Sequence, residues 1–204
     1  MQNNEYNSAV KHFFNHDVLI YKLMSNFEPL QLKLKRRYFH ALVTSIIGQQ
    51  LSVNSAKAII NRFNIYFDKR IDPHEVINTD IKVLRKIGLS AAKSNYVTDL
   101  SKKIISGEVK LKGISSKSND EIMTELCKVK GIGPWTVHMF LIFVLGRPNI
   151  LPVGDLGIKR AIMLNYNLKK LPTTEHVLKI AKNNNWEPYS TYASMYLWKS
   201  IDTN

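Results

Sequence analysis

The stretch LCKVKGIGPWT, residues 126–136, decides the fold of this 204-residue chain. It predicts two helices joined by a tight turn that contains Gly131 and Gly133, with Ile132 between them as a plug for the hydrophobic core. Pro134 stands where proline is tolerated, in the first turn of the second helix. The amides of such a turn can bind a phosphate, but a plain corner between two helices also uses glycine, and the spacing alone favours neither interpretation.

The sequence on both sides of this turn is helical in pattern. Apolar residues recur at three- and four-residue spacing, and no alternating run indicates a sheet. Ser118 and Glu121 have the spacing of a capping box, and Gly88, Gly107 and Gly146 mark helix ends. We therefore expect an all-α protein with one helix around residues 13–20, a break at 72–73, a helix beginning near residue 155, and helices at 38–47, 56–67, 81–87, 91–105, 118–129, 134–145, 175–182 and 189–199.

The composition is that of a folded protein with an excess of cations. There are 29 Lys and Arg against 16 Asp and Glu, which gives a net charge of +13 and favours a polyanionic partner, nucleic acid before a membrane surface. Cys127 is the only cysteine, so an internal disulfide, a four-cysteine zinc site and an iron–sulfur cluster are excluded. The six histidines show no HExxH spacing, and we expect no metal and no other cofactor. The N-terminus carries no targeting signal and no stretch is long enough to span a bilayer, so we expect an intracellular protein.

Four blocks of the chain, in this order, resemble the helix-hairpin-helix (HhH-GPD) DNA glycosylase superfamily. Within it they are most similar to the alkylated-base branch, DNA-3-methyladenine glycosylase II. The blocks are IIGQQLS at 46–52, VKGIGPWT at 129–136, LPVGDLGIKRA at 151–161, and WEPY at 186–189 followed by YLW at 196–198. The resemblance spans about residues 38–200 and implies two helical lobes. Residues 1–37 would pack with 151–204 as one lobe, and 38–150 would form a barrel-like lobe that ends in the hairpin at about 120–146.

The chain departs from the family's pattern in two places. Many relatives carry an arginine directly after the Pro-aromatic pair, where this chain has Ser190. The chain also begins almost at the helical core, so we expect no N-terminal β-domain of the kind that some bacterial relatives have. The lone cysteine excludes the iron–sulfur branch of the same superfamily.

The resemblance implies a monofunctional DNA glycosylase of base excision repair. Such an enzyme binds double-stranded DNA as a monomer, flips an alkylated purine such as 3-methyladenine or 7-methylguanine, and hydrolyses its N-glycosidic bond to leave an abasic site. Two other functions stay open: a related glycosylase for deaminated or oxidised purines, and a non-catalytic helix-hairpin-helix module that only binds DNA. A protein drawn to a membrane surface by charge alone is not supported by the pattern of apolar faces.

Asp155 matches the family's catalytic aspartate. A carboxylate beside the sugar C1′ stabilises the positive charge of an oxocarbenium-like transition state and orients the attacking water. An aspartate directly before an apolar helix is also an ordinary N-cap, and the two roles can coexist. Alkylated purines already carry a positive charge and leave without protonation by a general acid, so no second carboxylate is required.

Trp135 stands where glycosylases that also nick the backbone carry a lysine. Tryptophan has no amine to form a Schiff base, which predicts the absence of strand cleavage. Its ring could stack on a flipped cationic base, and Tyr189 matches a second aromatic position of the family's pocket. Both side chains could instead belong to the core.

The remaining candidate residues would hold the DNA. We expect Gln50 or Leu51, in the loop of residues 48–52, to fill the gap left by the flipped base. The alternative is that Leu51 merely begins the next helix and that Gln49 and Gln50 cap it. Contacts to the phosphate backbone are expected from the hairpin and from the basic pair after the aspartate: Lys130, Gly131, Ile132, Gly133, Thr136, Lys159 and Arg160.

Overall fold

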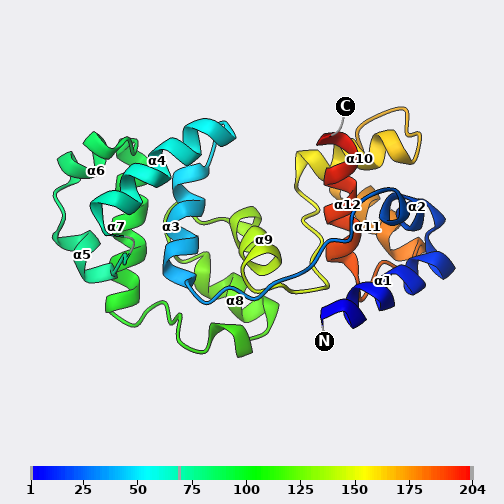
Figure 1. Ribbon diagram of the computed structural model, residues 1–204, viewed down its shortest axis with the longest axis horizontal. Helices are drawn as coiled ribbons and strands as arrows, with labels where there is room; N and C mark the ends of the chain where they lie inside the picture. Colours follow the sequence, from blue (N-terminus) through cyan, green and yellow to red (C-terminus); the bar gives the residue numbers. More distant parts are fainter. Residues whose placement is uncertain (1, 69, 203–204) are drawn as a thin grey trace. The chain divides into compact units, whose positions relative to one another are not determined.

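The computed structural model describes residues 2–68 and 70–202, and every regular element in these ranges is a helix (Figure 1). The all-α class predicted from the spacing of apolar residues is therefore confirmed. The helices are α1 (Gln2–His16), α2 (Val18–Asn26), α3 (Tyr38–Gly48), α4 (Val53–Tyr66), α5 (Pro73–Asn78), α6 (Ile81–Ile87), α7 (Ala91–Ile105), α8 (Asn119–Leu126), α9 (Pro134–Phe143), α10 (Leu156–Asn165), α11 (Thr174–Asn183) and α12 (Ser190–Asp202), with a 3₁₀ turn at Ile114–Ser116.

Local capping signals set several helix ends as predicted. In α8 the Ser118 hydroxyl accepts a hydrogen bond from the Glu121 amide, while the Glu121 carboxylate accepts one from the Ser118 amide. Gly88 ends α6 in the left-handed region with φ of 119°. Asp155 caps α10 by accepting from the Ile158 amide at 2.8 Å. Each of these signals acts within a few residues, which is why the sequence reveals it.

The first predicted helix is wrong in one respect, because it is two helices. The carboxylate of Asp17 accepts hydrogen bonds from the amides of Leu19 and Ile20 and starts α2 directly after α1 has ended. Apolar residues continue with helical spacing across this break, so their periodicity does not reveal it.

Two further differences concern proline and glycine. The sequence shows Asp72-Pro73 as a break, but Asp72 caps a short helix, α5, and Pro73 occupies its first turn. At the other end of the chain α9 stops at Phe143, two residues before the predicted end. There the chain turns through Gly146, with φ of 64°, and the Arg147 amide donates to the carbonyl of Leu141 at 2.9 Å.

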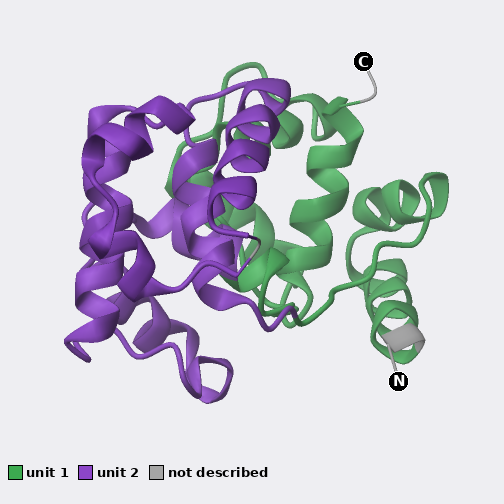
Figure 2. Ribbon diagram, turned by 60° about the vertical axis from the view of Figure 1, so that its left-hand side comes forward, with its two compact units in different colours: residues 1–34, 141–204 green, residues 35–140 purple. Residues whose placement is uncertain are grey.

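The chain divides into two compact units, coloured separately in Figure 2. Unit 1 comprises residues 1–34 and 141–204, and unit 2 comprises residues 35–140, so the border falls inside α9. Each unit has its own buried core. In unit 1 the core includes Phe13, Ile20, Ile158, Val177, Trp186, Tyr192, Tyr196 and Leu197, and in unit 2 it includes Leu42, Ile46, Phe63, Leu84, Val97, Leu100, Ile122, Leu126 and Val137. No helix in the described part of the chain has the length and apolar character needed to cross a membrane.

A buried carboxylate organises the core of unit 1. Asp17 is 3% exposed, and its Oδ2 accepts from the hydroxyl of Tyr166 at 2.6 Å and from the indole N–H of Trp186 at 2.8 Å. Burial, followed by the negative charge of Asp17, raises the pKa of Tyr166, so this hydroxyl remains a donor. One side chain thus starts α2 and also ties α2 to distant parts of the chain.

We predict that Asp17→Ala lowers the free energy of unfolding by about 3 kcal/mol or more, because two buried donors and two helix amides lose their acceptor. Asp80→Ala, which removes only the exposed cap of α6, should cost about 1 kcal/mol. Urea unfolding followed by circular dichroism measures both. Equal losses would show that the cluster around Asp17 contributes no more than a cap.

Candidate active site

The hairpin between α8 and α9 has the predicted geometry. Gly131 adopts the left-handed conformation with φ of 82°, and Ile132 points into the core at 3% exposure. The Ile132 amide donates to the carbonyl of Val129 at 3.1 Å, which closes the turn. The first turn of α9 follows at once, and helix geometry leaves the first amides of such a turn without a partner inside the helix. The arrangement is that of an anion site at a helix N-terminus.

The two glycines of the hairpin differ in what requires them. A Cβ on Gly131 would lie 2.1 Å from the ring of Tyr96, so packing and backbone conformation both demand glycine. A Cβ on Gly133 would meet nothing within 4 Å. A plain helical corner therefore explains Gly131 but not Gly133, where the backbone faces open space that a ligand can enter.

Side chains from α7 and from the residue that follows α3 hold the hairpin. The Lys130 amide donates to Asp99 Oδ2 at 2.8 Å. The side-chain amide of Gln49 donates to the Gly131 carbonyl at 2.8 Å and to Thr136 Oγ1 at 3.3 Å. Thr136 is buried and its hydroxyl accepts from Gln49, so this hydroxyl supports the hairpin. Sequence reasoning assigned no role to Asp99, and it considered Gln49 only as a residue of the inserting loop or as a cap of the next helix.

Unit 2 also carries four candidate residues with exposed side chains. Trp135 is 47% exposed, so the alternative that it belongs to the core is wrong. Lys130 is exposed beside the glycines. In the loop between α3 and α4, Gln50 is exposed with φ of 56°, an uncommon conformation for a residue other than glycine, and Leu51 is 38% exposed. Leu51 precedes α4, whose cap is Ser52, so it does not begin that helix.

Asp155 lies in unit 1 at the start of α10. Its Oδ1 accepts from the Ile158 amide at 2.8 Å and from the indole N–H of Trp198 at 2.9 Å. A Cβ on Gly157 would come within 3.0 Å of Asp155 Oδ1 and 3.1 Å of the Trp198 ring, so glycine at this position keeps room for the bond. The two donors fix the carboxylate. Asp155 is therefore an N-cap, as the alternative interpretation expects, and this role is compatible with a catalytic one.

Trp198 is the site residue that sequence reasoning missed. It forms part of the fourth block of the resemblance, but nothing in the sequence pairs it with Asp155, 43 positions earlier. Its ring stacks on Phe143, with centroids 5.9 Å apart and planes 28° apart. Phe143 is 43% exposed, so an aromatic pair flanks the carboxylate and part of it faces solvent.

The other candidates of unit 1 lie near the starts of α10 and α12. Arg160 is exposed, whereas the Lys159 ammonium donates to Thr174 at 3.3 Å. Tyr189 is half-buried and packs edge-on against His12, with ring centroids 5.2 Å apart, so its place in the base pocket stays a prediction. Ser190, which stands where many relatives carry an arginine, is only 4% exposed. Its side chain cannot take over a contact that an arginine would make.

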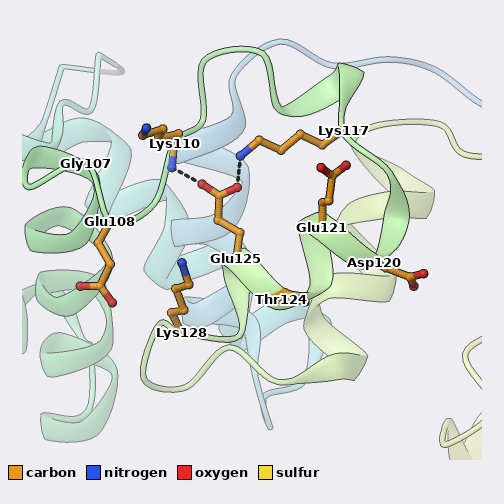
Figure 3. Close-up of a pocket in the computed structure, with 9 residues that line it drawn as sticks. All are labelled: Gly107, Glu108, Lys110, Lys117, Asp120, Glu121, Thr124, Glu125 and Lys128. Carbon is orange, nitrogen blue, oxygen red and sulfur yellow. Dashed lines mark hydrogen bonds and ion pairs between the residues drawn. The ribbon is translucent and has the colours of Figure 1, made fainter.

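A cavity of about 670 Å³ in unit 2 contains none of the predicted site residues (Figure 3). Figure 3 shows Glu125 on its wall between Lys117 and Lys110. Burial would raise the pKa of Glu125, but the bonds from Lys117 and from the Lys110 amide outweigh it, and the pKa is lower than usual. The ionised carboxylate anchors the preceding loop to α8, which is the first helix of the hairpin.

Comparison with known proteins identifies the family. A family model described as HhH-GPD superfamily base excision DNA repair protein matches residues 43–187. A Schizosaccharomyces pombe protein named DNA-3-methyladenine glycosylase 1 is 34% identical over 88% of this chain and 79% of its own length. YfjP of Bacillus subtilis is 35% identical over 84% of this chain, which spans 61% of that relative's length.

Solved structures agree with the sequence matches. A 3-methyladenine DNA glycosylase of S. pombe in complex with abasic DNA superposes with a TM-score of 0.81 at 31% identity, over 96% of this chain and 97% of that one. A DNA-3-methyladenine glycosidase of Bacillus halodurans gives a TM-score of 0.84 at 30% identity, over 96% of this chain and 89% of that one. The chain therefore belongs to the HhH-GPD superfamily of base excision DNA repair proteins.

Proposed function

We propose that this protein is a monofunctional DNA glycosylase that acts inside the cell on double-stranded DNA and releases alkylated purines, 3-methyladenine first and 7-methylguanine among others. The observation that carries the proposal is the carboxylate of Asp155, held by the Ile158 amide and the Trp198 indole in a chain of this family. Relatives named as 3-methyladenine glycosylases support the choice of substrate.

The chemistry needs one carboxylate. As the bond from C1′ to the base nitrogen breaks, its electron pair leaves with the alkylated base, which thereby loses its positive charge. Asp155 stabilises the cationic sugar and orients a water, whose oxygen forms the new bond to C1′ while its proton passes to the carboxylate and then to solvent. An alkylated purine needs no general acid, so a single fixed carboxylate suffices.

The hairpin is proposed to grip the phosphate backbone without reading sequence. A Cβ on Gly133 would meet nothing within 4 Å. Through this open space a phosphate would approach the main chain of Gly131, Ile132 and Thr136. Lys130 beside the hairpin, and Lys159 and Arg160 after Asp155, would contact further phosphates. In the wider organisation, residues 1–37 with 151–204 would act as one lobe and 38–150 as the other.

The base pocket is proposed to be aromatic. Trp135 is exposed enough to stack on an extruded base, and an electron-rich ring attracts a cationic one. Tyr189 is proposed as a second aromatic residue that contacts the base. Gln50 or Leu51 would enter the gap in the duplex, since both are exposed at the tip of their loop.

The decisive experiment incubates methylated DNA with the protein and identifies the released bases by chromatography. We expect free 3-methyladenine from the wild type and a loss of at least about 10²-fold in Asp155→Asn, because the carboxylate charge disappears. Asparagine still caps α10, so the variant should bind abasic DNA and unfold as the wild type does. If the wild type releases no base from any damaged DNA, the protein is a binding module.

The position of Trp135 leads to a second prediction. Borohydride reduction in the presence of damaged DNA should trap no covalent adduct, because the residue at this position has no amine to attack the sugar. Gel electrophoresis of the reaction measures the adduct, with a strand-nicking glycosylase as the positive control. A trapped complex would show that another amine performs lyase chemistry.

Trp198→Phe tests the support of the carboxylate. Phenylalanine keeps the ring against Phe143 but removes the donor to Asp155. We expect base release to fall by about tenfold, as for the loss of one hydrogen bond to a charged group. Binding of abasic DNA should be unchanged. A rate equal to that of the wild type would show that the Ile158 amide alone fixes the carboxylate.

A further inference from the structure

A lysine on α7 holds the loop between α3 and α4. The ammonium of Lys93 donates to the carbonyl of Ile47 at 2.8 Å and to the carbonyl of Gln49 at 2.6 Å. These carbonyls lie at the C-terminus of α3, where helix geometry leaves acceptors unpaired and the helix dipole attracts a cation. Figure 1 shows α7 beside α3, and the two helices are in contact.

Lys93 is not a usual surface lysine. It is half-buried, and burial lowers its pKa. Neither of the two ion pairs found in the described ranges involves it. Its ammonium is hydrogen-bonded to two main-chain carbonyls instead. The position of the Lys93 side chain therefore serves the geometry of the loop rather than attraction to a carboxylate.

Gln49 extends this support to the hairpin. Its main-chain carbonyl is held by Lys93, while its side-chain amide donates to the Gly131 carbonyl and to Thr136 Oγ1. A single residue therefore joins the loop to the turn that we propose binds phosphate. Any movement of Gln49 would shift both elements.

The residue that follows is held in an uncommon conformation. Gln50 has φ of 56° although it carries a side chain. Such strain costs about 1–3 kcal/mol and persists only where the surroundings fix the backbone. The two carbonyls that Lys93 binds come shortly before this residue, so the lysine restrains the chain where the strain lies.

The same side of α7 contacts the hairpin. Lys93, Tyr96 and Asp99 follow at three-residue spacing, which places them near one another on the helix surface. Tyr96 packs on Gly131, and Asp99 accepts from the Lys130 amide. One helix thus supports the loop and the hairpin together.

We infer that Lys93 and Gln49 are positioning residues that keep the loop of Gln50 and Leu51 in register with the hairpin, so that a side chain enters the duplex at a fixed distance from the bound phosphates. This inference rests on the proposed function. Without the hydrogen bonds of Lys93 and Gln49 the chemistry at Asp155 is intact, but the loop meets the gap in the wrong place. An error of about 1 Å at such a position can cost about 10²-fold in rate.

The test compares Lys93→Met on two duplexes that carry one 7-methylguanine, either opposite cytosine or opposite an abasic-site analogue. Extruding a base is hardest when it is paired. We expect kcat/KM to fall by about tenfold or more on the paired lesion, and by about threefold or less on the unpaired one, because the latter depends less on the inserted side chain. A merely structural or catalytic defect would lower both equally.

Lys102→Met is the matched control, because it removes the same charge from an exposed position on α7. It should change neither rate at fixed salt. Gln49→Leu should reproduce the selective loss, and it keeps the inference testable if Lys93→Met fails to fold. Lys93→Arg should recover part of the activity, since a guanidinium can also donate to two carbonyls.

A second measurement does not depend on catalysis. A 2-aminopurine placed next to an abasic-site analogue becomes brighter when a side chain enters the stack. We expect the wild type to raise this fluorescence and Lys93→Met to raise it far less at saturating protein. If the two proteins give equal fluorescence, or if Lys93→Met loses activity equally on both duplexes, the inference is overturned. If the wild type releases no base but raises the fluorescence far more than Lys93→Met does, the proposed function fails, while the positioning of the loop by Lys93 still holds for DNA binding.

Discussion

The packing of Tyr96 against Gly131 is the contact on which the hairpin depends. A Cβ at this glycine would lie 2.1 Å from the ring, so the turn can approach α7 only because residue 131 has no side chain. That approach brings the Lys130 amide to Asp99 and the Gly131 carbonyl to Gln49. These contacts hold the turn at Gly131. The space beside Gly133, where a Cβ would meet nothing within 4 Å, stays open. The part of unit 2 that we propose binds phosphate is therefore shaped by a helix distant from it in sequence.

In unit 1 the carboxylate of Asp155 is likewise held in place by the fold. The Ile158 amide and the Trp198 indole both donate to Oδ1, so the carboxylate is fixed by the protein before any substrate arrives. Transition-state stabilisation is strongest when charges need no rearrangement during the reaction. A capping aspartate meets this requirement, because the cap that stabilises α10 also orients the group that would act on the sugar. The structural role thus supports the catalytic one rather than competing with it.

What the sequence predicts well is local, and what it misses joins distant residues. The capping box of Ser118 and Glu121, and Asp155 as a cap, act within three positions and are visible in the sequence. The break at Asp17 depends partly on bonds to Tyr166 and Trp186, 149 and 169 positions away. The same holds for the site. Motifs indicate the hairpin and the aspartate, but not the supporting side chains, since they are polar residues of ordinary helices whose partners only the fold brings close.

The supporting contacts also change how the net charge of +13 should be understood. Several lysines already serve the protein itself: Lys93 donates to carbonyls, and Lys103 and Lys117 pair with carboxylates. Counterion release counts only the cations that reach phosphates. The number of phosphates neutralised must therefore be smaller than the count of basic residues suggests. We propose that the exposed remainder holds the DNA non-specifically, and that the choice of base falls to the exposed Trp135 and to the Asp155 carboxylate, which uncharged donors fix.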